Sequence, residues 1–576
     1  MTAILGLNAY HGDAAAALVV DGELVAAAEE ERFNRVKHCA GFPAHAARWC
    51  LDDAGLRPDE IDHVAVSRDP RANLGRKILR TLRHGTSPRY LRERIQNAAR
   101  VRDAGAALAE ALGVDGLRAS VHNVEHHQAH VASAFFVSPF DDAAILSVDG
   151  FGDFASTMLA EGHGNRFEVL ERVLYPHSLG IFYTAVTQWL GFPKYGDEGK
   201  VMGLAPYGRP RYVDRMRELV SLDSPLFELG LEFFTHDTEG VDMTWDEGSP
   251  TIGRIYSDAL VQLLGPAREA GAPMTELYED VAASLQVVLE DAYLHLCRTL
   301  YERTKLPSLC LAGGVALNAV ANGRILPETP FRDLYVQPAA GDSGTAVGAA
   351  YYVWNQELGR PRAFVMEHAY TGPEYDDAEI RSALAEAGLH AERLDDAALF
   401  AEVAERIAAG DVVGWFQGRM EFGPRALGHR SIVADPRSHT MKDVLNARVK
   451  HREPFRPFAP SILAERTSEW YEQDYPSPFM VLVYKTAAAK REEVPAVNHV
   501  DDTGRLQTVE REVEPRYHRL ISEFARRTGV PILLNTSFNE NEPIVMTPRD
   551  ALETFKKTRI DVLALGNYLV RRNGAS

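Results

Sequence analysis

The sequence predicts an α/β fold whose first part contains a duplicated unit. An apolar, strand-like run at residues 3–8 is followed by a short polar loop and by a second strand-like run at 16–20. The same order returns at 143–149 and 155–159, again with a loop of Gly and Asp between the two runs. Runs of this length, bounded by turn residues, are typical of strands, and their repetition indicates two related units.

A domain boundary is predicted near residues 358–375, where turn-forming residues gather. Beyond this segment the loops become rich in Arg, Gly and Pro. A chain of 576 residues is long enough for two or more domains with cores of their own. We therefore expect one domain over residues 1–360 and a second over residues 361–576.

The bulk composition is that of a globular protein, with 45% apolar and 25% charged residues. The net charge of −19 argues against a general affinity for nucleic acid, which favours a basic surface. Four cysteines without a C-x-x-C pair indicate reduced thiols and, with them, a cytoplasmic location. The first residues lack a basic segment and no apolar run could span a bilayer, so neither a signal peptide nor a membrane anchor is expected.

The first polar loop carries His11 at its tip, and Asp21-Gly22 then joins the next two strand-like runs as a hairpin. A histidine in such a position can act as a general acid or base. An ordinary solvated histidine explains the same position equally well.

His126 and His130 lie four residues apart, and on a helix this spacing places both imidazoles on one face. Two carboxylates, Asp149 and Asp342, follow strand-like runs and stand beside glycine. Side chains at strand ends are exposed and held in place by the scaffold. Two imidazoles and two carboxylates suit Fe(II), Mn(II) or Zn(II) better than Mg(II) or Ca(II). Ordinary surface histidines on a helix are the alternative.

The glycines of residues 196–208 surround Lys200 and would let backbone amides approach an anion closely, although the spacing is not that of a P-loop. Residues 209–274 show weaker patterning and are interpreted as an insertion in which substrate specificity would reside. The Arg-rich segment 70–102 is expected to form surface helices with a break at 85–88.

The clearest helix is predicted over residues 277–300, whose apolar residues recur on one face. It leads into a strand at 308–312 that ends at Gly313-Gly314, with Asn318 shortly beyond. A strand, a glycine pair and a helix start can seat a nucleotide, but a single glycine pair is a weak signal.

Two basic clusters, at 418–431 and 449–458, combine Arg and Lys with Gly, Pro and Phe. In an acidic chain this composition indicates an anion pocket for phosphates, while exposed basic loops are the alternative. The polar residues 535–539 follow a strand-like run at 531–534 and are placed to reach a ligand.

Four motifs stand out together: His126-x-x-x-His130, GKVMGLAPYG at 199–208, GGVALN at 313–318 and GPRALGHRS at 423–431. In combination they resemble the NodU/CmcH family of O-carbamoyltransferases, whose members carbamoylate nodulation factors, cephamycins and tobramycin. The GPRALGHRS motif is the most diagnostic of the four. The resemblance extends from about Ile4 to about Leu569.

This resemblance implies a duplicated actin-like (ASKHA) domain fused to a YrdC-like α/β domain. In such enzymes the C-terminal domain makes carbamoyl-adenylate from carbamoyl phosphate and ATP, with Mg²⁺ assisting. The N-terminal domain then transfers the carbamoyl group to an acceptor hydroxyl. The implied acceptor is a natural product such as an antibiotic, a sugar or a macrolide, made in secondary metabolism. Neither nucleic acid nor a membrane is an expected partner, and a homodimer is left open.

The resemblance also implies roles for individual residues. The ligands of Fe²⁺, or of another divalent transition metal, would be His126, His130, Asp149 and Asp342. Catalytic roles fall on His11, Lys450 and Arg456. With the glycine-rich loops included, contacts to the nucleotide or to carbamoyl phosphate are expected from Lys200, Gly313, Gly314, Asn318, Arg425, Arg452, Arg505, Ser537 and Asn539.

Three other functions are weighed against this one. A threonylcarbamoyl transferase acting on tRNA would share the N-terminal domain, but the net charge of −19 and the Arg-rich C-terminal part fit it less well. A hydrogenase-maturation carbamoyltransferase normally carries C-x-x-C zinc motifs and an acylphosphatase domain, and neither is recognised in this sequence. The third alternative is a metal-binding scaffold without activity, and the presence of His11, Lys450, Arg456 and Ser537 argues against it.

Overall fold

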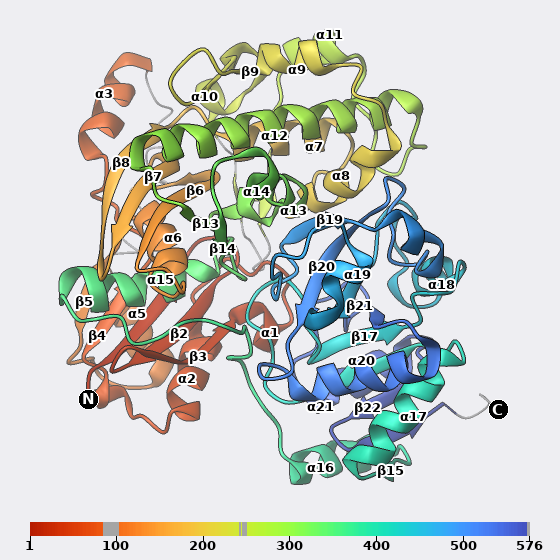
Figure 1. Ribbon diagram of the computed structural model, residues 1–576. Coiled ribbons are helices and arrows are strands. Elements are labelled where there is room, and N and C mark those ends of the chain that lie inside the picture. Colours follow the sequence, from red (N-terminus) through yellow and green to blue (C-terminus); the bar gives the residue numbers. More distant parts are fainter. Residues whose placement is uncertain (85–102, 241–242, 245–249, 573–576) are drawn as a thin grey trace. The chain divides into compact units, whose positions relative to one another are not determined.

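The computed structural model describes residues 1–84, 103–240, 243–244 and 250–572 (Figure 1). Helices and strands alternate along much of the chain, so the predicted α/β class is confirmed. The chain divides into two compact units, Met1–Met366 and Glu367–Ser576. The sequence predicts this division between residues 360 and 361.

The first unit begins with a sheet of strand order β3-β2-β1-β4-β5. The strands are β1 (Ala3–Asn8), β2 (Ala15–Val20), β3 (Glu23–Glu29), β4 (His63–Val66) and β5 (Ser120–Asn123). Strands β1, β2 and β3 are antiparallel, whereas β4 and β5 run parallel to β1. Asp21 and Gly22 form the β2–β3 turn with positive φ at both residues, which is typical of an Asp-Gly hairpin.

A second sheet in the same unit repeats this topology with the order β14-β13-β6-β7-β8. Its strands are β6 (Asp142–Gly152), β7 (Ala155–His163), β8 (Arg166–Leu174), β13 (Ser308–Ala312) and β14 (Asp333–Val336). Again three consecutive strands are antiparallel and two further strands run parallel to the first of them. The two sheets therefore have the duplicated architecture that the recurring sequence pattern predicts.

Two helices pack unusually closely in this unit. These are α6 (His126–Phe135) and α15 (Gly344–Tyr351). A Cβ atom on Gly348 would lie 1.8 Å from the carbonyl oxygen of Ala129 in α6, and one on Gly6 would lie 2.0 Å from that of Ala346 in α15. Only glycine lets the backbones of β1, α15 and α6 approach to this distance.

The predicted helix at 277–300 is present as α12 (Glu276–Thr304), which packs on β6 and β7 (Figure 1). The Arg-rich segment begins with a helix, α3 (Leu74–His84), while its predicted break at 85–88 lies outside the described residues. Other helices of the unit are α1 (Glu30–Asn34), α2 (Ala44–Asp53), α5 (Ala104–Leu112), α7 (Leu179–Trp189), α8 (Glu198–Leu204), α13 (Ala319–Gly323) and α14 (Ile325–Glu328).

The predicted insertion at 209–274 consists of short elements in its described part. They are α9 (Val213–Leu219), β9 (Val220–Ser221), β10 (Glu228–Leu229), α10 (His236–Glu239), β11 (Met243–Thr244), β12 (Thr251–Ile252) and α11 (Asp258–Leu264). Two-residue strands leave little apolar periodicity, which explains the weak pattern in the sequence.

Within residues 367–572, the second unit is built on a nine-stranded mixed sheet of order β15-β23-β22-β16-β17-β21-β18-β20-β19. The strands are β15 (Glu392–Arg393), β16 (Val413–Phe416), β17 (Arg430–Ala434), β18 (Ala459–Leu463), β19 (Leu482–Lys485), β20 (Thr503–Val509), β21 (Ile532–Ser537), β22 (Val562–Leu565) and β23 (Tyr568–Arg571). The helices are α16 (Asp377–Ala387), α17 (Asp396–Ala408), α18 (Met441–Leu445), α19 (Thr467–Trp470), α20 (Pro515–Thr528) and α21 (Pro548–Lys557). Helices α17 and α20 pack on each other, and α16 packs on α21.

All four cysteines are buried, and none of them forms a disulfide in the described part of the chain. In the described part of the chain, no helix has both the length and the apolar character needed to cross a membrane.

Candidate functional site

Helix α6 presents a histidine pair at its first turn. Glu125 caps the helix by accepting a hydrogen bond from the amide of Gln128 at 2.9 Å. His126 and His130 are both buried, and their Nε2 atoms lie 3.1 Å apart. Two imidazole nitrogens so close in a buried position are suited to share one cation.

Two carboxylates face this histidine pair. Asp149 Oδ2, on β6, lies 3.3 Å from His126 Nε2 and 3.1 Å from His130 Nε2. Asp342 Oδ1, in the loop between β14 and α15, lies 3.5 Å and 3.6 Å from the same two nitrogens. One potential ligand atom from each of the four residues lies within 4.8 Å of the others.

The spacing of these four atoms matches a transition-metal site. Tetrahedral ligands at about 2.0–2.2 Å from an ion are separated from one another by about 3.3–3.6 Å. The distances from each histidine to the two carboxylates, 3.1–3.6 Å, are close to that range. Asp342 Oδ1 is also buried without a hydrogen-bond partner in the described chain, as expected of an atom kept for an ion. The four residues therefore fit a divalent cation.

The electrostatics of the cluster also favour a positive charge. Burial lowers the pKa of His130, but the neighbouring carboxylates of Asp149 and Asp342 outweigh burial and raise the pKa to about 9. Asp342 is buried and Asp149 partly buried, so a cation between the two carboxylates would offset their repulsion and the free-energy cost of removing them from water.

His11 lies beside this cluster, in the loop after β1. Its Nδ1 is 2.5 Å from Asp342 Oδ2, and its ring centre is 5.0 Å from that of His126. The Asn8 amide holds the loop by donating to the carbonyls of Gly12 and Asp13 at 2.9 and 3.0 Å. Burial lowers the pKa of His11, but the charge and hydrogen bond of Asp342 outweigh burial and raise it above 6.5.

The glycine pair after β13 shapes the same cluster. Gly313 has a φ of +90°, and a Cβ there would lie 2.2 Å from the carbonyl oxygen of Val148. The amide of Gly314 donates to Asp149 Oδ1 at 3.1 Å and so orients that carboxylate. The structure thus places both glycines beside the cluster of His126, His130, Asp149 and Asp342. Their contacts to a nucleotide remain a prediction.

Asn318 and Lys200, the other predicted nucleotide contacts of this unit, have protein partners. Asn318 Oδ1 accepts from the amide of Ala321 and from Gln286 Nε2, while Asn318 Nδ2 donates to Gln286 Oε1. Lys200 Nζ, on α8, lies 2.8 Å from Asp197 Oδ1. A nucleotide would have to compete with these bonds, and the predicted roles remain untested.

Lys450 in the second unit is almost fully buried, at 2% exposure. Its Nζ donates to the carbonyls of Ser537 and Asn539 at 2.6 and 2.8 Å and to Asn539 Oδ1 at 2.7 Å. These bonds use all three N–H groups of the ammonium. Three residues for which the resemblance implies roles, Lys450, Ser537 and Asn539, are therefore brought together through the ammonium group of Lys450.

The four predicted phosphate-contacting arginines, Arg425, Arg452, Arg456 and Arg505, also lie close together. Burial, together with the charge of Arg456, lowers the pKa of Arg425 to about 10 and that of Arg452 to about 9. Burial, followed by the charges of the other three arginines, lowers the pKa of Arg505 strongly. The Nε atoms of Arg425 and Arg505 are buried without a hydrogen-bond partner in the described residues. Such a set of mutually repelling cations is suited to an anion.

With this geometry established, two family models account for most of the chain. The model of the carbamoyltransferase N-terminus matches residues 3–351, and that of the carbamoyltransferase C-terminus matches residues 404–572. The chain belongs to the carbamoyltransferase family. The predicted family is thereby confirmed, and the protein is a carbamoyltransferase enzyme.

Relatives of this carbamoyltransferase cover nearly its whole length. An uncharacterized protein of Synechocystis sp. is 42% identical over 99% of this chain and 97% of its own. Nodulation protein NolNO of Sinorhizobium fredii is 41% identical over 99% of this chain and 80% of its own. Nodulation protein NolO of Bradyrhizobium diazoefficiens is 42% identical over 79% of this chain and 80% of its own.

The GPRALGHRS motif of this carbamoyltransferase divides into two parts with different environments. Arg425 belongs to the group of four arginines, whereas His429 and Arg430 form hydrogen bonds within the second unit. His429 Nε2 lies 2.6 Å from Glu514 Oε2. Arg430 is fully buried, donates to the carbonyls of Gln417, Pro373 and others, and lies over the Phe416 ring at 3.7 Å. The motif therefore contributes Arg425 to the group of four arginines, and His429 and Arg430 to hydrogen bonds within the second unit.

Two residues near His11 escaped the sequence analysis. Arg68 follows β4, donates to the carbonyl of Tyr10 at 2.9 Å, and places its charge where it lowers the pKa of His11. Tyr195 OH lies 3.5 Å from Asp342 Oδ2. Arg68 stands just beyond the end of β4, which is the kind of position that the sequence predicts for Asp149. For Asp149 that prediction is wrong, because β6 continues to Gly152, and nothing local distinguishes Tyr195.

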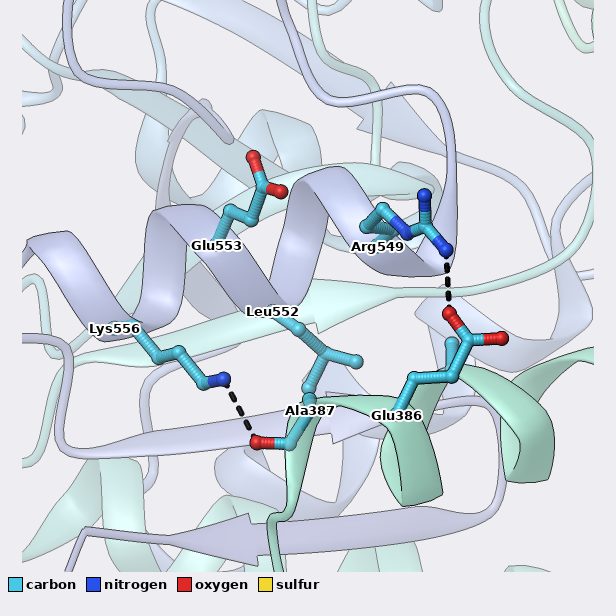
Figure 2. Close-up of a pocket in the computed structure, with 7 residues that line it drawn as sticks. Glu386, Ala387, Arg549, Leu552, Glu553 and Lys556 are labelled. Atoms are coloured by element: carbon cyan, nitrogen blue, oxygen red, sulfur yellow. Dashed lines mark hydrogen bonds and ion pairs between the residues drawn. The ribbon is translucent and has the colours of Figure 1, made fainter.

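A shallow hollow between α16 and α21 is a different kind of surface (Figure 2). Glu386 forms an ion pair with Arg549 across it, and Lys556 Nζ donates to the carbonyl of Ala387 at 2.8 Å. Because these charges are exposed and satisfy one another, the hollow is not a candidate for the chemistry.

Proposed function

We propose that this carbamoyltransferase is an ATP-dependent O-carbamoyltransferase that works in two steps at two sites. The YrdC-like second unit would form carbamoyl-adenylate from carbamoyl phosphate and ATP. The actin-like first unit would transfer the carbamoyl group to a hydroxyl of a natural product. The observation that carries the proposal is that one unit gathers four arginines and Lys450 while the other gathers two histidines and two carboxylates.

The first step needs positive charge in the second unit. Carbamate is a weak electrophile, and joining it to AMP gives it a phosphate leaving group. Water would hydrolyse carbamoyl phosphate to carbamate and phosphate. A carbamate oxygen would then attack the α-phosphorus of ATP, and pyrophosphate would leave, so several anionic groups must be held together. Arg425, Arg452, Arg456 and Arg505 would offset that charge, with Mg²⁺ on ATP. Lys450 would keep Ser537 and Asn539 in position, because its three N–H groups all bond to them.

The second step needs a base in the first unit. The 2.5 Å contact fixes the tautomer of neutral His11, because ionised Asp342 can only accept, so Nδ1 must carry the proton. Nε2 then holds the lone pair and would take the proton of the acceptor hydroxyl as that oxygen attacks the carbamoyl carbon. AMP leaves with the electron pair of the broken bond.

His126, His130, Asp149 and Asp342 would hold a divalent transition metal, for which we propose Fe²⁺. Bound there, it would supply a Lewis acid for the phosphate of the adenylate. The short His11–Asp342 contact links this ligand set to the proposed base. The acceptor, which we propose to be an antibiotic, sugar or macrolide, would react at this site.

The test is to measure pyrophosphate and phosphate released from carbamoyl phosphate plus ATP, with and without a panel of hydroxylated natural products. Wild type should form pyrophosphate, Lys450→Ala should not, and His11→Ala should form it without carbamoylating any acceptor. Absence of pyrophosphate with the wild-type enzyme would contradict the assignment of the second unit. Threonylcarbamoyl-adenylate would then be tried as the donor.

A further inference from the structure

One polar side chain beside the arginine group is buried and incompletely bonded. Asn446 begins a π-helical turn, Asn446–Lys450, that continues α18 and leads to Lys450. Its side chain is 8% exposed. Asn446 Oδ1 accepts from Arg452 Nε at 3.1 Å, whereas Nδ2 is buried without a hydrogen-bond partner in the described residues.

The orientation of this amide is determined by its partner. Arg452 Nε is a donor, so it must face the oxygen of Asn446 and not the nitrogen. Rotating the amide would set two donors against each other and leave the oxygen unpaired. Nδ2 therefore keeps two N–H groups that no described residue accepts, which is costly inside a protein unless a ligand takes them.

Asn446 is also one of several groups that fix Arg452. The guanidinium lies over the Phe458 ring at 4.5 Å and donates through one terminal nitrogen to the carbonyl of Pro457 at 3.3 Å. Together with the bond from Nε to Asn446, three contacts restrain the plane of the guanidinium. The remaining N–H groups of Arg452 are available for a ligand in a fixed geometry.

The surroundings of the amide are cationic. Lys442 stands one helical turn before Asn446, and its pKa is lowered by burial and by the charge of Arg452. Arg456 and Arg505 lie close enough for their charges to act on Arg452 and on each other. An N–H donor in such a place adds a neutral contact to an anion without adding to the repulsion among the cations.

We propose that Asn446 is a positioning and binding residue of the anion site: its Oδ1 aligns Arg452, and its Nδ2 donates to an oxygen of a bound phosphoryl group. This inference rests on the proposed function in that the second unit binds phosphates. The π-helical turn has a role here, because it places Asn446 and Lys450 on one continuous segment.

The proposal is tested by titrating full-length protein calorimetrically with inorganic phosphate and, separately, with pyrophosphate. Asn446→Ala should weaken binding of at least one anion about tenfold, and Asn446→Asp, which keeps an acceptor for Arg452 but adds a negative charge, should weaken it more. Asn541→Asp adds the same charge at an exposed position and serves as the control. Loss for phosphate alone assigns the amide to the carbamoyl-phosphate side, and loss for pyrophosphate alone assigns it to the ATP side.

A purely structural role gives a different result. If Asn446 binds the anion, Asn446→Ala removes a buried unpaired donor together with the acceptor for Arg452 Nε. These two effects on stability oppose each other, so the melting temperature without anion should stay near that of wild type. Turnover should show a raised KM for carbamoyl phosphate or ATP with kcat nearly unchanged. Unchanged affinity for both anions, or a lowered melting temperature with normal anion affinity, overturns the inference. Wild-type protein that binds both anions but forms no pyrophosphate would instead contradict the proposed function and leave the role of Asn446 standing.

Discussion

The carboxylate of Asp342 is shared between His11 and the histidine pair of α6. Its Oδ2 lies 2.5 Å from His11 Nδ1, while its Oδ1 lies 3.5 Å from His126 Nε2. A single side chain thus joins the proposed base of the transfer step to the candidate metal ligands. Changes at this residue should affect both functions together.

Replacing Asp342 by Asn should lower bound metal at least about tenfold and abolish carbamoyl transfer. The substitution removes the negative charge, and the single amide oxygen cannot accept from both His11 and the metal site. Pyrophosphate formation should continue, since the arginine group lies in the other unit. Metal per chain by mass spectrometry and pyrophosphate release measure the two effects. Asp333→Asn, on the preceding strand, is the matched control. Full metal occupancy in Asp342→Asn would remove this residue from the ligand set.

Gly348→Ala should destabilise the first unit by about 3 kcal/mol or more, because its Cβ would meet the Ala129 carbonyl at 1.8 Å. Helix α6 carries the candidate ligand His130, and α15 begins two residues after Asp342, so metal binding should weaken as well. Thermal unfolding and metal content are the measurements. Gly75→Ala, where an added Cβ meets nothing within 4 Å, should leave both unchanged. A Gly348→Ala protein as stable as wild type would show that the helices can separate freely.

Arg505→Gln should raise the melting temperature in the absence of anions by roughly 2–4 °C, because it removes a partly buried cation from repulsion by three others. The same change should lower pyrophosphate formation sharply. Arg511→Gln, at an exposed position, should alter neither property. If Arg505→Gln is less stable than wild type without anions, then the arginine contributes packing that outweighs the repulsion.

The His429–Glu514 pair should make the stability of the second unit depend on pH. Burial lowers the pKa of His429, but the charge and hydrogen bond of Glu514 outweigh burial and raise it above 6.5. A raised folded-state pKa stabilises the protein fully below pH 6.5, and this contribution is lost as the pH rises through the folded-state value. Glu514→Gln should therefore cost roughly 1.5–3 kcal/mol at pH 5.5 and much less at pH 9.

Urea unfolding of wild type and Glu514→Gln at both pH values measures that difference. Glu512→Gln, two residues away and exposed, controls for the loss of a negative charge. A destabilisation of equal size at the two pH values would mean that the pair does not titrate with folding.

Much of the first unit follows from local rules. The helix at 277–300 could be predicted because its apolar residues recur with helical periodicity. The turn could be predicted because an Asp-Gly pair readily adopts the positive φ angles of a hairpin turn. The four candidate ligands could be proposed for the same reason, since helical spacing and strand ends are local signals. The contact between His11 and Asp342, which are 331 positions apart, could not be predicted from such local signals.

The rest depends on contacts that no local pattern encodes. Asn446 matters because its amide meets Arg452 through a π-helical turn, and Tyr195 because folding brings it to Asp342. Asn318 looks like a ligand-facing residue in the sequence, yet a partner 32 positions away engages both ends of its amide. The actin-like and YrdC-like assignments and the domain limits likewise remain predictions.

The hydrogen bonds of Lys450 have a consequence for how substitutions accumulate during evolution. Its three N–H groups all bond to the stretch 537–539, 87 or more positions away. The lysine and that stretch thus act as one cooperative unit. Once one of them is substituted, a substitution in the other should have little further effect on activity. Paired substitutions at Lys450 and Asn539 should therefore cost far less than the sum of the single ones, so that drift at one motif relaxes selection on the other.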